Sequence, residues 1–257
     1  MNKLHRLDDV QLFDRQRRSL HAFYRMMASA SGGRLLEADR LTACVIPATP
    51  ERSVCNGVVY DEAGSLVDEL DGLTEGYDAA GIKAWTVWVP AGDRTAREAL
   101  AERGHMLDAA PAAMAFELAT FKREESAGAE IDSAGDPSDI GRINDIAYGY
   151  DGDFTRAIQH LAPEVAHPYL ARIDGSAVAS TVALDCEGDC CITLVATLPE
   201  ARGRGCATKL ITRALTDARE RGCTTTSLQA TQMGKPVYER LGYRDLGPYE
   251  MWERRRI

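Results

Sequence analysis

The stretch from Leu194 to Ala207 restricts the fold more than any other part of this sequence. An apolar run there reaches Pro199 and is followed by Arg202-Gly203-Arg204-Gly205-Cys206-Ala207. Beyond it, apolar residues recur with helical spacing at Leu210, Ile211, Ala214, Leu215 and Ala218. The pattern predicts a strand, a glycine-containing turn and a helix in direct succession.

The predicted turn has the properties of an anion-binding site. The first amide groups of a helix have no partner within the helix, and the helix dipole is positive at that end. Gly203 and Gly205 lack a Cβ atom and let a phosphate approach the backbone, while Arg202 and Arg204 add positive charge. The turn has neither the Gly-Lys-Ser/Thr of a P-loop nor the Gly-x-Gly-x-x-Gly of a dinucleotide fold. These residues predict a nucleotide-like cofactor, bound through its pyrophosphate.

Two linked motifs resemble those of the GNAT (Gcn5-related) N-acetyltransferases. The spacing Arg-x-x-Gly-x-Ala from Arg202 to Ala207, after a strand ending in Val-x-x-x-Pro, resembles the acyl-CoA signature of that family. Residues 227–243, SLQATQMGKPVYERLGY, are similar to its next strand, its next helix and its Tyr-x-x-x-Gly-aromatic ending. The resemblance covers residues 131–253 and implies an acyl-CoA-dependent acetyltransferase.

The resemblance also implies where acetyl-CoA binds. In this family a V-shaped gap separates the strand that ends at Leu198 from the strand that ends near Ala230, and the pantetheine arm pairs with the first of them as an added strand would. The cofactor-binding residues expected are Ala196, Thr197, Leu198, Arg202, Gly203, Arg204, Gly205, Cys206, Ala207 and Thr231. Tyr238 occupies the position of the tyrosine that the family places near the CoA sulfur, so its phenol is the expected catalytic acid.

The sequence departs from the family pattern at two places. Thr231 stands where the family usually has an asparagine, so either Gln229 or Thr231 is left to hydrogen-bond the cofactor arm. The strand Cys191–Pro199, where related enzymes often carry a glutamate, has no carboxylate, and the general base stays unidentified; a water relay is one alternative. The candidates for amine binding are Asp151, Asp153 and His160, which lie on or beside the loop between the first two helices of the second half. Asp153 could instead cap the second of these helices.

Composition argues against several other classes of protein. The chain has 257 residues, a net charge of −9 and a pI near 5.1, which disfavours nucleic-acid or anionic-membrane binding and fits a cationic substrate better. No apolar run approaches a length of about 18 residues, and the N-terminal residues have no signal-peptide pattern. The seven cysteines are an odd number without a paired Cys-x-x-Cys frame, so neither a disulfide framework nor a metal site is expected. The expected location is cytoplasmic.

The chain resembles itself at an offset of 141 residues (222 − 81). Gly81–Val89, GIKAWTVWV, and Gly222–Ala230, GCTTTSLQA, share their alternation, and each follows one helical pattern and precedes another. The length of the chain also favours two domains. The expected fold is α/β (α+β), with two tandem GNAT-like units, each a mixed, mostly antiparallel sheet flanked by helices.

The two predicted units differ at the turn. At this offset Arg202 and Gly205 correspond to Asp61 and Gly64, and only acidic residues carry charge from Asp61 until Lys83. A phosphate would be repelled there, so the first unit is predicted to bind no CoA and to support the second unit or shape its acceptor channel. The predicted domains are a degenerate unit at 1–121, a linker at 122–137 rich in charged and small residues, and a catalytic unit at 138–257.

The sequence therefore predicts an acetyl-CoA-dependent N-acetyltransferase that acts on the primary amine of a small molecule by direct attack in a ternary complex. A ping-pong route through cysteine is disfavoured, because neither Cys206 nor Cys223 evidently lies beside a base. The alternative is a non-catalytic acyl-CoA-binding sensor or scaffold, which the missing strand carboxylate favours. A nucleotide-binding regulator is a third, weaker alternative because the corresponding motifs are absent. The acceptor amine and the oligomeric state stay open.

Overall fold

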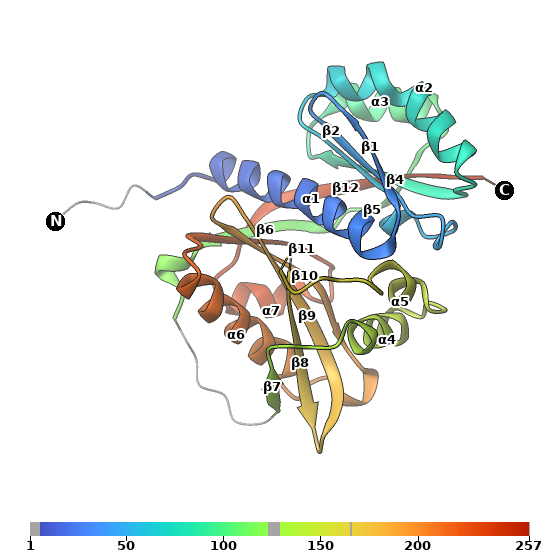
Figure 1. The fold of residues 1–257 in the computed structure, drawn as a ribbon. Coiled ribbons are helices and arrows are strands. Elements are labelled where there is room, and N and C mark those ends of the chain that lie inside the picture. The colour runs from blue at the N-terminus through green and yellow to red at the C-terminus, as the bar shows by residue number, and fades with distance from the viewer. Residues whose placement is uncertain (1–5, 123–128, 165, 257) are drawn as a thin grey trace.

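A computed structural model of the chain describes residues 6–122, 129–164 and 166–256. The fold is mixed α/β, and its helices flank one open sheet whose strands are mostly antiparallel, which confirms the fold class expected from the sequence. In Figure 1 the first half lies at the upper right and the second half below it, with α1 running between them. Among the described residues, no helix combines the length and the apolar character needed to cross a membrane.

Helices and strands follow one another closely in both halves. The elements of the first half are α1 (Asp9–Ser31), β1 (Arg34–Ala38), β2 (Leu41–Val45), β3 (Gly57–Tyr60), α2 (Ala63–Ala79), β4 (Ala84–Pro90), α3 (Arg94–Glu102), β5 (Met106–Ala109) and β6 (Ala112–Glu117). The elements that follow are β7 (Glu130–Asp132), α4 (Pro137–Tyr148), α5 (Asp153–Ala157), β8 (His167–Ile173), β9 (Ser176–Cys186), β10 (Asp189–Thr197), α6 (Cys206–Glu220), β11 (Thr225–Ala230), α7 (Lys235–Arg240) and β12 (Arg244–Arg255). The strand, turn and helix predicted around residues 194–218 are thus confirmed as β10, the turn and α6.

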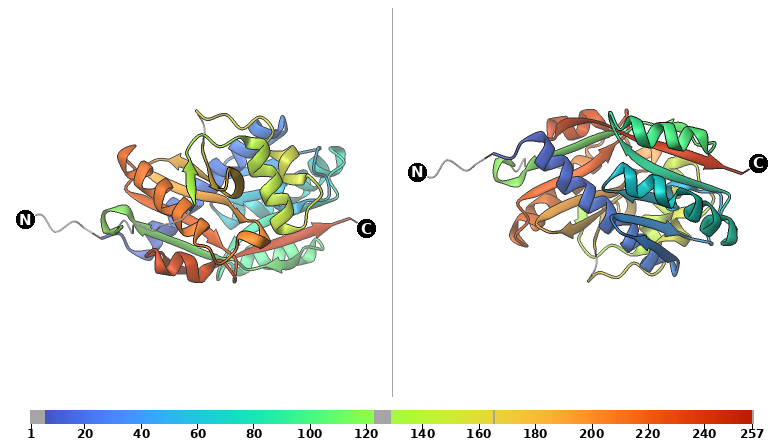
Figure 2. Two further views of the ribbon diagram at one scale, coloured as in Figure 1. Left: turned by 90° about the horizontal axis from the view of Figure 1, so that it is seen from below. Right: turned by 90° about the horizontal axis from the view of Figure 1, so that it is seen from above.

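The sheet runs through both halves in the order β1-β2-β3-β4-β12-β6-β11-β10-β9-β8-β7, and β5 also pairs with β12. The pairs β3–β4 and β10–β11 are parallel. Strand β6 of the first half pairs with β11 over six positions, while β12 of the second half pairs with β4 over seven. Figure 2 shows the red β12 lying along the elements of the first half. Each half therefore supplies a strand that borders the sheet of the other half.

The repeat offset of 141 residues recurs in the elements themselves. The starts of β4 and β11 (84 and 225) and the starts of α3 and α7 (94 and 235) have this separation. Helices α2 and α6 precede these strands, and each is followed by a glycine of positive φ, Gly81 at 72° and Gly222 at 98°, as helix C-termini favour. The division into 1–121, 122–137 and 138–257 stays a prediction, because one sheet joins the halves and residues 123–128 lie outside the described residues.

Helix α1 holds the two halves together. Its start is set by Asp8, whose carboxylate accepts a hydrogen bond from the Gln11 amide at 2.8 Å within a capping box. On one side Ser19 donates to the buried Asp189 of β10 at 2.7 Å. On the other side Tyr24 accepts a hydrogen bond from Trp88 Nε1 of β4 at 2.6 Å. Because α1 is bonded to strands of both halves, it fixes the geometry of the space between them.

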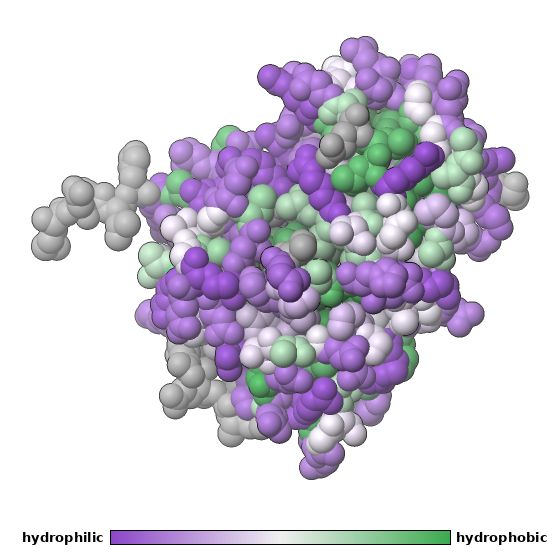
Figure 3. Space-filling model, in the orientation of Figure 1, coloured by the Kyte–Doolittle hydropathy of each residue, from purple (hydrophilic) through white to green (hydrophobic). Residues whose placement is uncertain are grey.

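Most of the face seen in Figure 1 is covered by charged and polar residues. In the space-filling view, apolar residues gather mainly near β1 and β2 of the first half (Figure 3). Behind them lies a core formed by α2, α3 and strands β2 to β4, with fully buried Leu66, Leu70 and Val87. A larger core extends from α1 through the second half.

Candidate active site

A cleft of about 900 Å³ lies where the two halves meet. Residues of α4, β10, the turn before α6, β11 and α7 form one wall, and residues of α1, β4, β5 and β12 form the other. Most of the cofactor-binding residues expected from the sequence line it, as does Tyr238: Ala196, Thr197, Arg202, Gly203, Gly205, Cys206, Ala207 and Thr231. Leu198 and Arg204 are not among the residues that line the cleft.

The edge of β10 opens into this cleft. Strands β10 and β11 are in parallel register only from Asp189↔Thr225 to Cys191↔Ser227. From Ile192 onward, the side of β10 that faces β11 has no strand partner among the described residues. The V-shaped gap expected from the family resemblance is therefore present. It leaves backbone groups of β10 available to an extended ligand.

One expected backbone group is not available. The Leu198 amide donates a hydrogen bond to the Val178 carbonyl at 2.9 Å, so the expectation that this N–H is unpaired is wrong. Neighbouring residues of a strand direct their backbone groups to opposite edges, so the Thr197 amide faces the gap. The reason for the error is that β9 continues beside β10 to its end, with Thr197 in register with Ala179.

A β-bulge interrupts β10 beside the cleft, between Thr193 and Ala196. Leu194 within it has φ of 50°, a left-handed conformation that is uncommon for residues other than glycine. Asn144 of α4 holds the bulge, because its Nδ2 donates to the Leu194 carbonyl at 3.2 Å and lies 3.1 Å from Ser180 Oγ. Such bulges redirect backbone groups and side chains at active sites. The backbone of Leu194 to Ala196 lines the cleft at this point.

The turn before α6 leaves free amide groups and open space. Gly203 and Gly205 have φ of 76° and 75°, and a Cβ atom added to either would have no neighbour within 4 Å. The Lys209 amide donates to the Gly205 carbonyl at 3.0 Å, and the amides of residues 206–208 precede that first helical hydrogen bond. Both properties fit a pyrophosphate held by backbone amides at a helix N-terminus.

The two arginines of the turn have different positions. Arg202 lines the cleft, and its guanidinium donates to the carbonyls of Thr197 and Ala147, each at 3.3 Å. Arg204 is exposed and does not line the cleft. Arg202 therefore fixes the turn against β10 and α4 in addition to bringing positive charge to the cleft.

Tyr238 presents a protonated phenol to the cleft. Its side chain is 7 % exposed, and its ring packs edge-on against Tyr243 with centroids 5.8 Å apart. Burial raises the pKa of Tyr238 far above its usual value, and Tyr148 adds to this effect. Within the described part of the chain, no hydrogen bond uses its hydroxyl group. The phenol is thus a neutral hydrogen-bond donor at ordinary pH.

The structure distinguishes the two candidates for binding the cofactor arm. The Thr231 hydroxyl accepts a hydrogen bond from the Gly234 amide at 3.2 Å, at the start of α7. Gln229 also lines the cleft, and its Nε2 is buried without a partner among the described residues. An unpaired buried donor is costly unless a ligand satisfies it, so Gln229 fits the arm better than Thr231 does.

The acidic residues expected to bind the amine lie outside the cleft lining. Asp151 is exposed, and Asp153 is bound by Arg52 at 2.7 Å and by Arg156 at 2.7 Å. Helix α5 begins at Asp153 itself, and its first turn is capped by Asp145, which accepts from the amides of Phe154 and Thr155. The capping role considered for Asp153 is therefore wrong. His160 is likewise exposed and does not line the cleft.

Charged residues that the sequence interpretation missed line the wall opposite β10. They are Arg52, Asp108, Glu253 and Arg255. Arg52 lies over the Tyr150 ring at 3.7 Å from its centroid. Arg52 and Asp108 lie more than 50 residues from the motifs at 194–243, so no local pattern links them to the cleft. For Glu253 and Arg255, the alternation along β12 was the one available signal.

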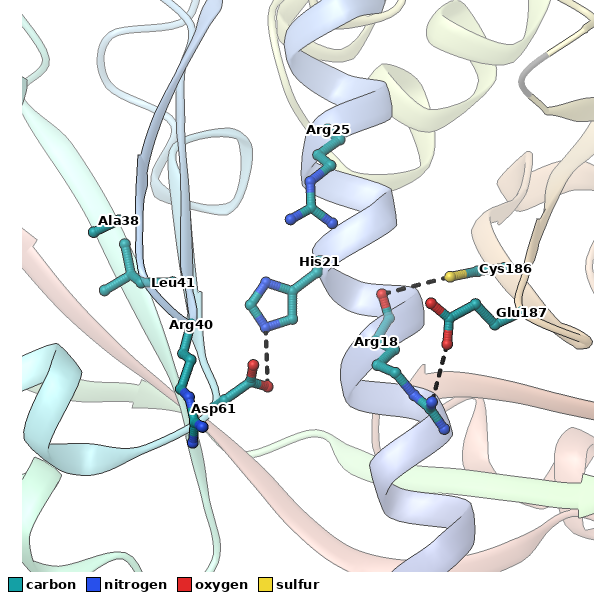
Figure 4. A pocket seen from close by; sticks show the side chains of 9 residues that line it. All are labelled: Arg18, His21, Arg25, Ala38, Arg40, Leu41, Asp61, Cys186 and Glu187. Carbon is teal, nitrogen blue, oxygen red and sulfur yellow. Dashed lines mark hydrogen bonds and ion pairs between the residues drawn. The ribbon is translucent and has the colours of Figure 1, made fainter.

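A second cavity, of about 360 Å³, lies between α1 and the turns at residues 38–41 and 186–187 (Figure 4). Most of its charged groups already take part in ion pairs. Arg18 pairs with Glu187 at 2.9 Å, and His21 Nε2 lies 3.5 Å from Asp61. Burial lowers the pKa of His21, although Asp61 opposes the effect. Asp61 and Glu62, at the start of α2, thus pair with His21 and Arg40 at the place that corresponds to the turn before α6.

Comparison with known proteins agrees with this geometry. Residues 140–243 match the model of the acetyltransferase (GNAT) family. A GCN5-related N-acetyltransferase from Kribbella flavida superposes with a TM-score of 0.69 at 18% identity, over 93% of this chain and 95% of that one. A GCN5-related N-acetyltransferase from Sphaerobacter thermophilus gives a TM-score of 0.59 at 16% identity, over 84% and 76%. No curated protein matches this chain.

The chain thus carries a GNAT acetyltransferase domain at residues 140–243, as the resemblance of its motifs predicted. The solved structures show the same fold along nearly the whole chain. Family and fold together support acyl-CoA-dependent acetyl transfer in general, and the family generally uses acetyl-CoA.

Proposed function

We propose that this protein is an acetyl-CoA-dependent N-acetyltransferase that transfers the acetyl group to a primary amine within a ternary complex. One observation carries the proposal: a single cleft contains the glycine turn before α6, the unpaired edge of β10 and the buried phenol of Tyr238. These three features correspond to a site for the pyrophosphate, a site for an extended arm and a proton donor.

The donor half of the cleft fits acetyl-CoA. The open space at Gly203 and Gly205 and the free amides of residues 206–208 suit the pyrophosphate, and the unpaired Gln229 Nε2 suits an amide oxygen of the arm. When bound, acetyl-CoA supplies an activated acyl carbon. This chain's residues orient the donor along β10 and exclude water on the side formed by α1 and β4.

The transfer requires one bond to form and one to break. An acceptor bound as its ammonium form first loses a proton to water. The neutral amine nitrogen then bonds to the acyl carbon, the carbon–sulfur bond breaks, and the nitrogen loses a second proton to water. Tyr238 gives its hydroxyl proton to the departing sulfur and is reprotonated from solvent. The high pKa of Tyr238 keeps this proton in place until the thiolate forms.

A direct transfer is favoured over a covalent cysteine intermediate. Burial, with Asp185 nearby, raises the pKa of Cys223 to about 12, so its thiol is not activated at neutral pH. Cys206 is 2 % exposed at the first position of α6. Cys223 therefore lacks the lowered pKa that a nucleophilic cysteine needs, and Cys206 is enclosed at the start of α6.

The first half of the chain then serves as a degenerate unit that completes the acceptor side. Asp61 and Glu62 pair with basic side chains where the second half has its glycine turn, which supports the absence of a second CoA site. Phe23, Trp88 and Asp108 of this half line the cleft opposite β10. The acceptor amine accordingly approaches between the halves.

Calorimetric titration with acetyl-CoA tests the donor site directly. We expect one site per chain in the wild type and at least a tenfold loss of affinity in Gly205→Asp, because the carboxylate repels the pyrophosphate. Gly205→Asn is the matched control for backbone strain, since asparagine tolerates positive φ about as well as aspartate does. The asparagine variant is expected to retain more of the affinity.

The titration also separates the alternatives. No binding by the wild type would overturn the acetyltransferase proposal, and two sites per chain would show that the first half has its own. The absence of a carboxylate from Cys191 to Pro199 favours a non-catalytic acyl-CoA-binding sensor as the second candidate. That candidate predicts binding of acetyl-CoA without release of CoA in the presence of any amine in a broad panel.

A further inference from the structure

On the wall of the cleft opposite β10, a β-bulge in β5 sets the direction of the Asp108 side chain. Met251 of β12 is in register with Ala109 and Trp252 is in register with Leu107, so Asp108 is the extra residue of β5. An extra residue of this kind redirects its side chain away from the regular alternation of the strand. Within the described residues β5 pairs only with β12, and Asp108 lines the cleft.

The other charged groups on this wall already have partners. Met251, Glu253 and Arg255 alternate along β12 and all line the cleft. Arg255 donates to Glu253 through Nε at 2.8 Å and through a second nitrogen at 3.1 Å. Arg52 donates to Asp153 at 2.9 Å. These two pairs neutralise both arginines of the wall.

Asp108 is the charged residue of this wall that has no partner among the described residues. Among the residues that the structure describes, its carboxylate makes no hydrogen bond and no ion pair. Partial burial raises the pKa of Asp108, Glu253 adds to the rise, and Arg255 opposes it. Asp108 is itself exposed in the cleft lining, so its unpaired carboxylate is accessible to a ligand that carries a positive charge.

The surroundings of Asp108 define what a ligand must carry. Phe23, Val54 and Trp88 contribute apolar surface to the same cleft. We propose that Asp108 binds the ammonium group of the acceptor, and that the acceptor is a monocationic primary amine on an apolar or aromatic body. The inference rests on the proposed function for the role of this ligand as acceptor, while binding of the amine is measurable without any transfer.

The test uses the full chain and a simple probe, 2-phenylethylamine, with 2-phenylethanol as its uncharged counterpart. Affinities are measured by calorimetry at pH 7.5 for the wild type, Asp108→Asn and Asp39→Asn. Asp39 is the matched control because its side chain is 96% exposed and does not line the cleft. We expect the amine to bind at least tenfold more weakly to Asp108→Asn, and equally to the wild type and the control. Binding of the alcohol should be the same in all three proteins.

Two results would overturn the inference: equal amine affinity in the wild type and Asp108→Asn, or no amine binding by the wild type. Should the variant fail to fold, the wild type alone decides. Its affinity for the amine, but not for the alcohol, should fall as the pH drops, beginning above the range of an ordinary aspartate because the pKa of Asp108 is raised. Acetyl-CoA is titrated in parallel to distinguish this inference from the proposed function. If the amine binds in a manner that depends on Asp108 but acetyl-CoA does not bind, the proposed function is contradicted and the amine site at Asp108 is retained.

Discussion

At the scale of single residues, Tyr238 combines a packing role with an exposed chemical group. Its ring contributes to the core beside Tyr243, whereas its hydroxyl is left for a ligand. The two roles are separable by a substitution that keeps the ring. Such a substitution therefore distinguishes an effect on catalysis from an effect on protein stability.

We predict that Tyr238→Phe lowers kcat by about 10²-fold or more, because an acid positioned for proton transfer contributes a factor of this size. Calorimetry should give an acetyl-CoA Kd within about twofold of the wild type, since the ring is retained. Steady-state kinetics on any amine that the wild type acetylates provides the measurement. An unchanged kcat would show that the phenol only packs.

Several site residues that the sequence indicates do line the cleft, and they share one property: the prediction for each follows from its immediate neighbours in the chain. Gly203, Gly205 and Tyr238 lie in motifs whose spacing alone indicates a turn and a helix. Asp108 lies in the exposed strand β5, and nothing around it in the sequence differs from an ordinary surface strand. Its position in the cleft depends on pairing with residues about 140 positions later, which no local pattern contains.

At the scale of elements, a buried side chain of α4 stabilises the β-bulge in β10. The Asn144 side chain is 1 % exposed and donates through Nδ2 to the Ile140 carbonyl at 2.9 Å and to the Leu194 carbonyl at 3.2 Å. The helix thereby holds an uncommon backbone conformation of Leu194 in place. The sequence predicted a helix and a strand in this part of the chain but not this connection between them.

We predict that Asn144→Ala lowers the free energy of unfolding by about 1–3 kcal/mol, because it leaves buried hydrogen-bonding groups without a partner. It should also weaken acetyl-CoA binding, since the open edge of β10 follows the bulge. Urea unfolding and calorimetry measure the two effects. Ile146→Ala, at a half-exposed position of the same helix, is the control and should change stability by less than about 0.5 kcal/mol. Equal stability losses in both variants would contradict this role.

At the scale of the whole molecule, the two halves share one sheet instead of touching as separate bodies. The sequence predicted two units from their repeat and from the composition of residues 122–137. It did not predict that β6 and β12 lie side by side between the two sets of strands, with Arg244 in register with Ala115. The repeat reveals which elements are alike, whereas the pairing of β6 with β12 joins residues about 130 positions apart, which a repeat does not indicate.

We predict that residues 129–257, produced alone, do not fold. This fragment lacks β6, which covers the edge of β11, and α1, whose Ser19 satisfies the buried Asp189. Produced together with residues 1–128, it should form a soluble complex, because the cut lies between β6 and β7 and breaks no helix or strand among the described residues. Circular dichroism and size-exclusion chromatography measure both outcomes. A folded, monomeric fragment 129–257 would show that the exchanged strand is dispensable.

The position of β12 also affects the order in which the molecule is completed during translation. As the polypeptide leaves the ribosome, β4 and β5 emerge more than 130 residues before the strand that pairs with them. Until then the first half keeps an uncovered row of amide and carbonyl groups, which is the kind of surface that promotes association between nascent chains. The acceptor wall, with Glu253 and Arg255, is consequently assembled last, so a chain released prematurely has its donor turn but not the surface that would select an amine.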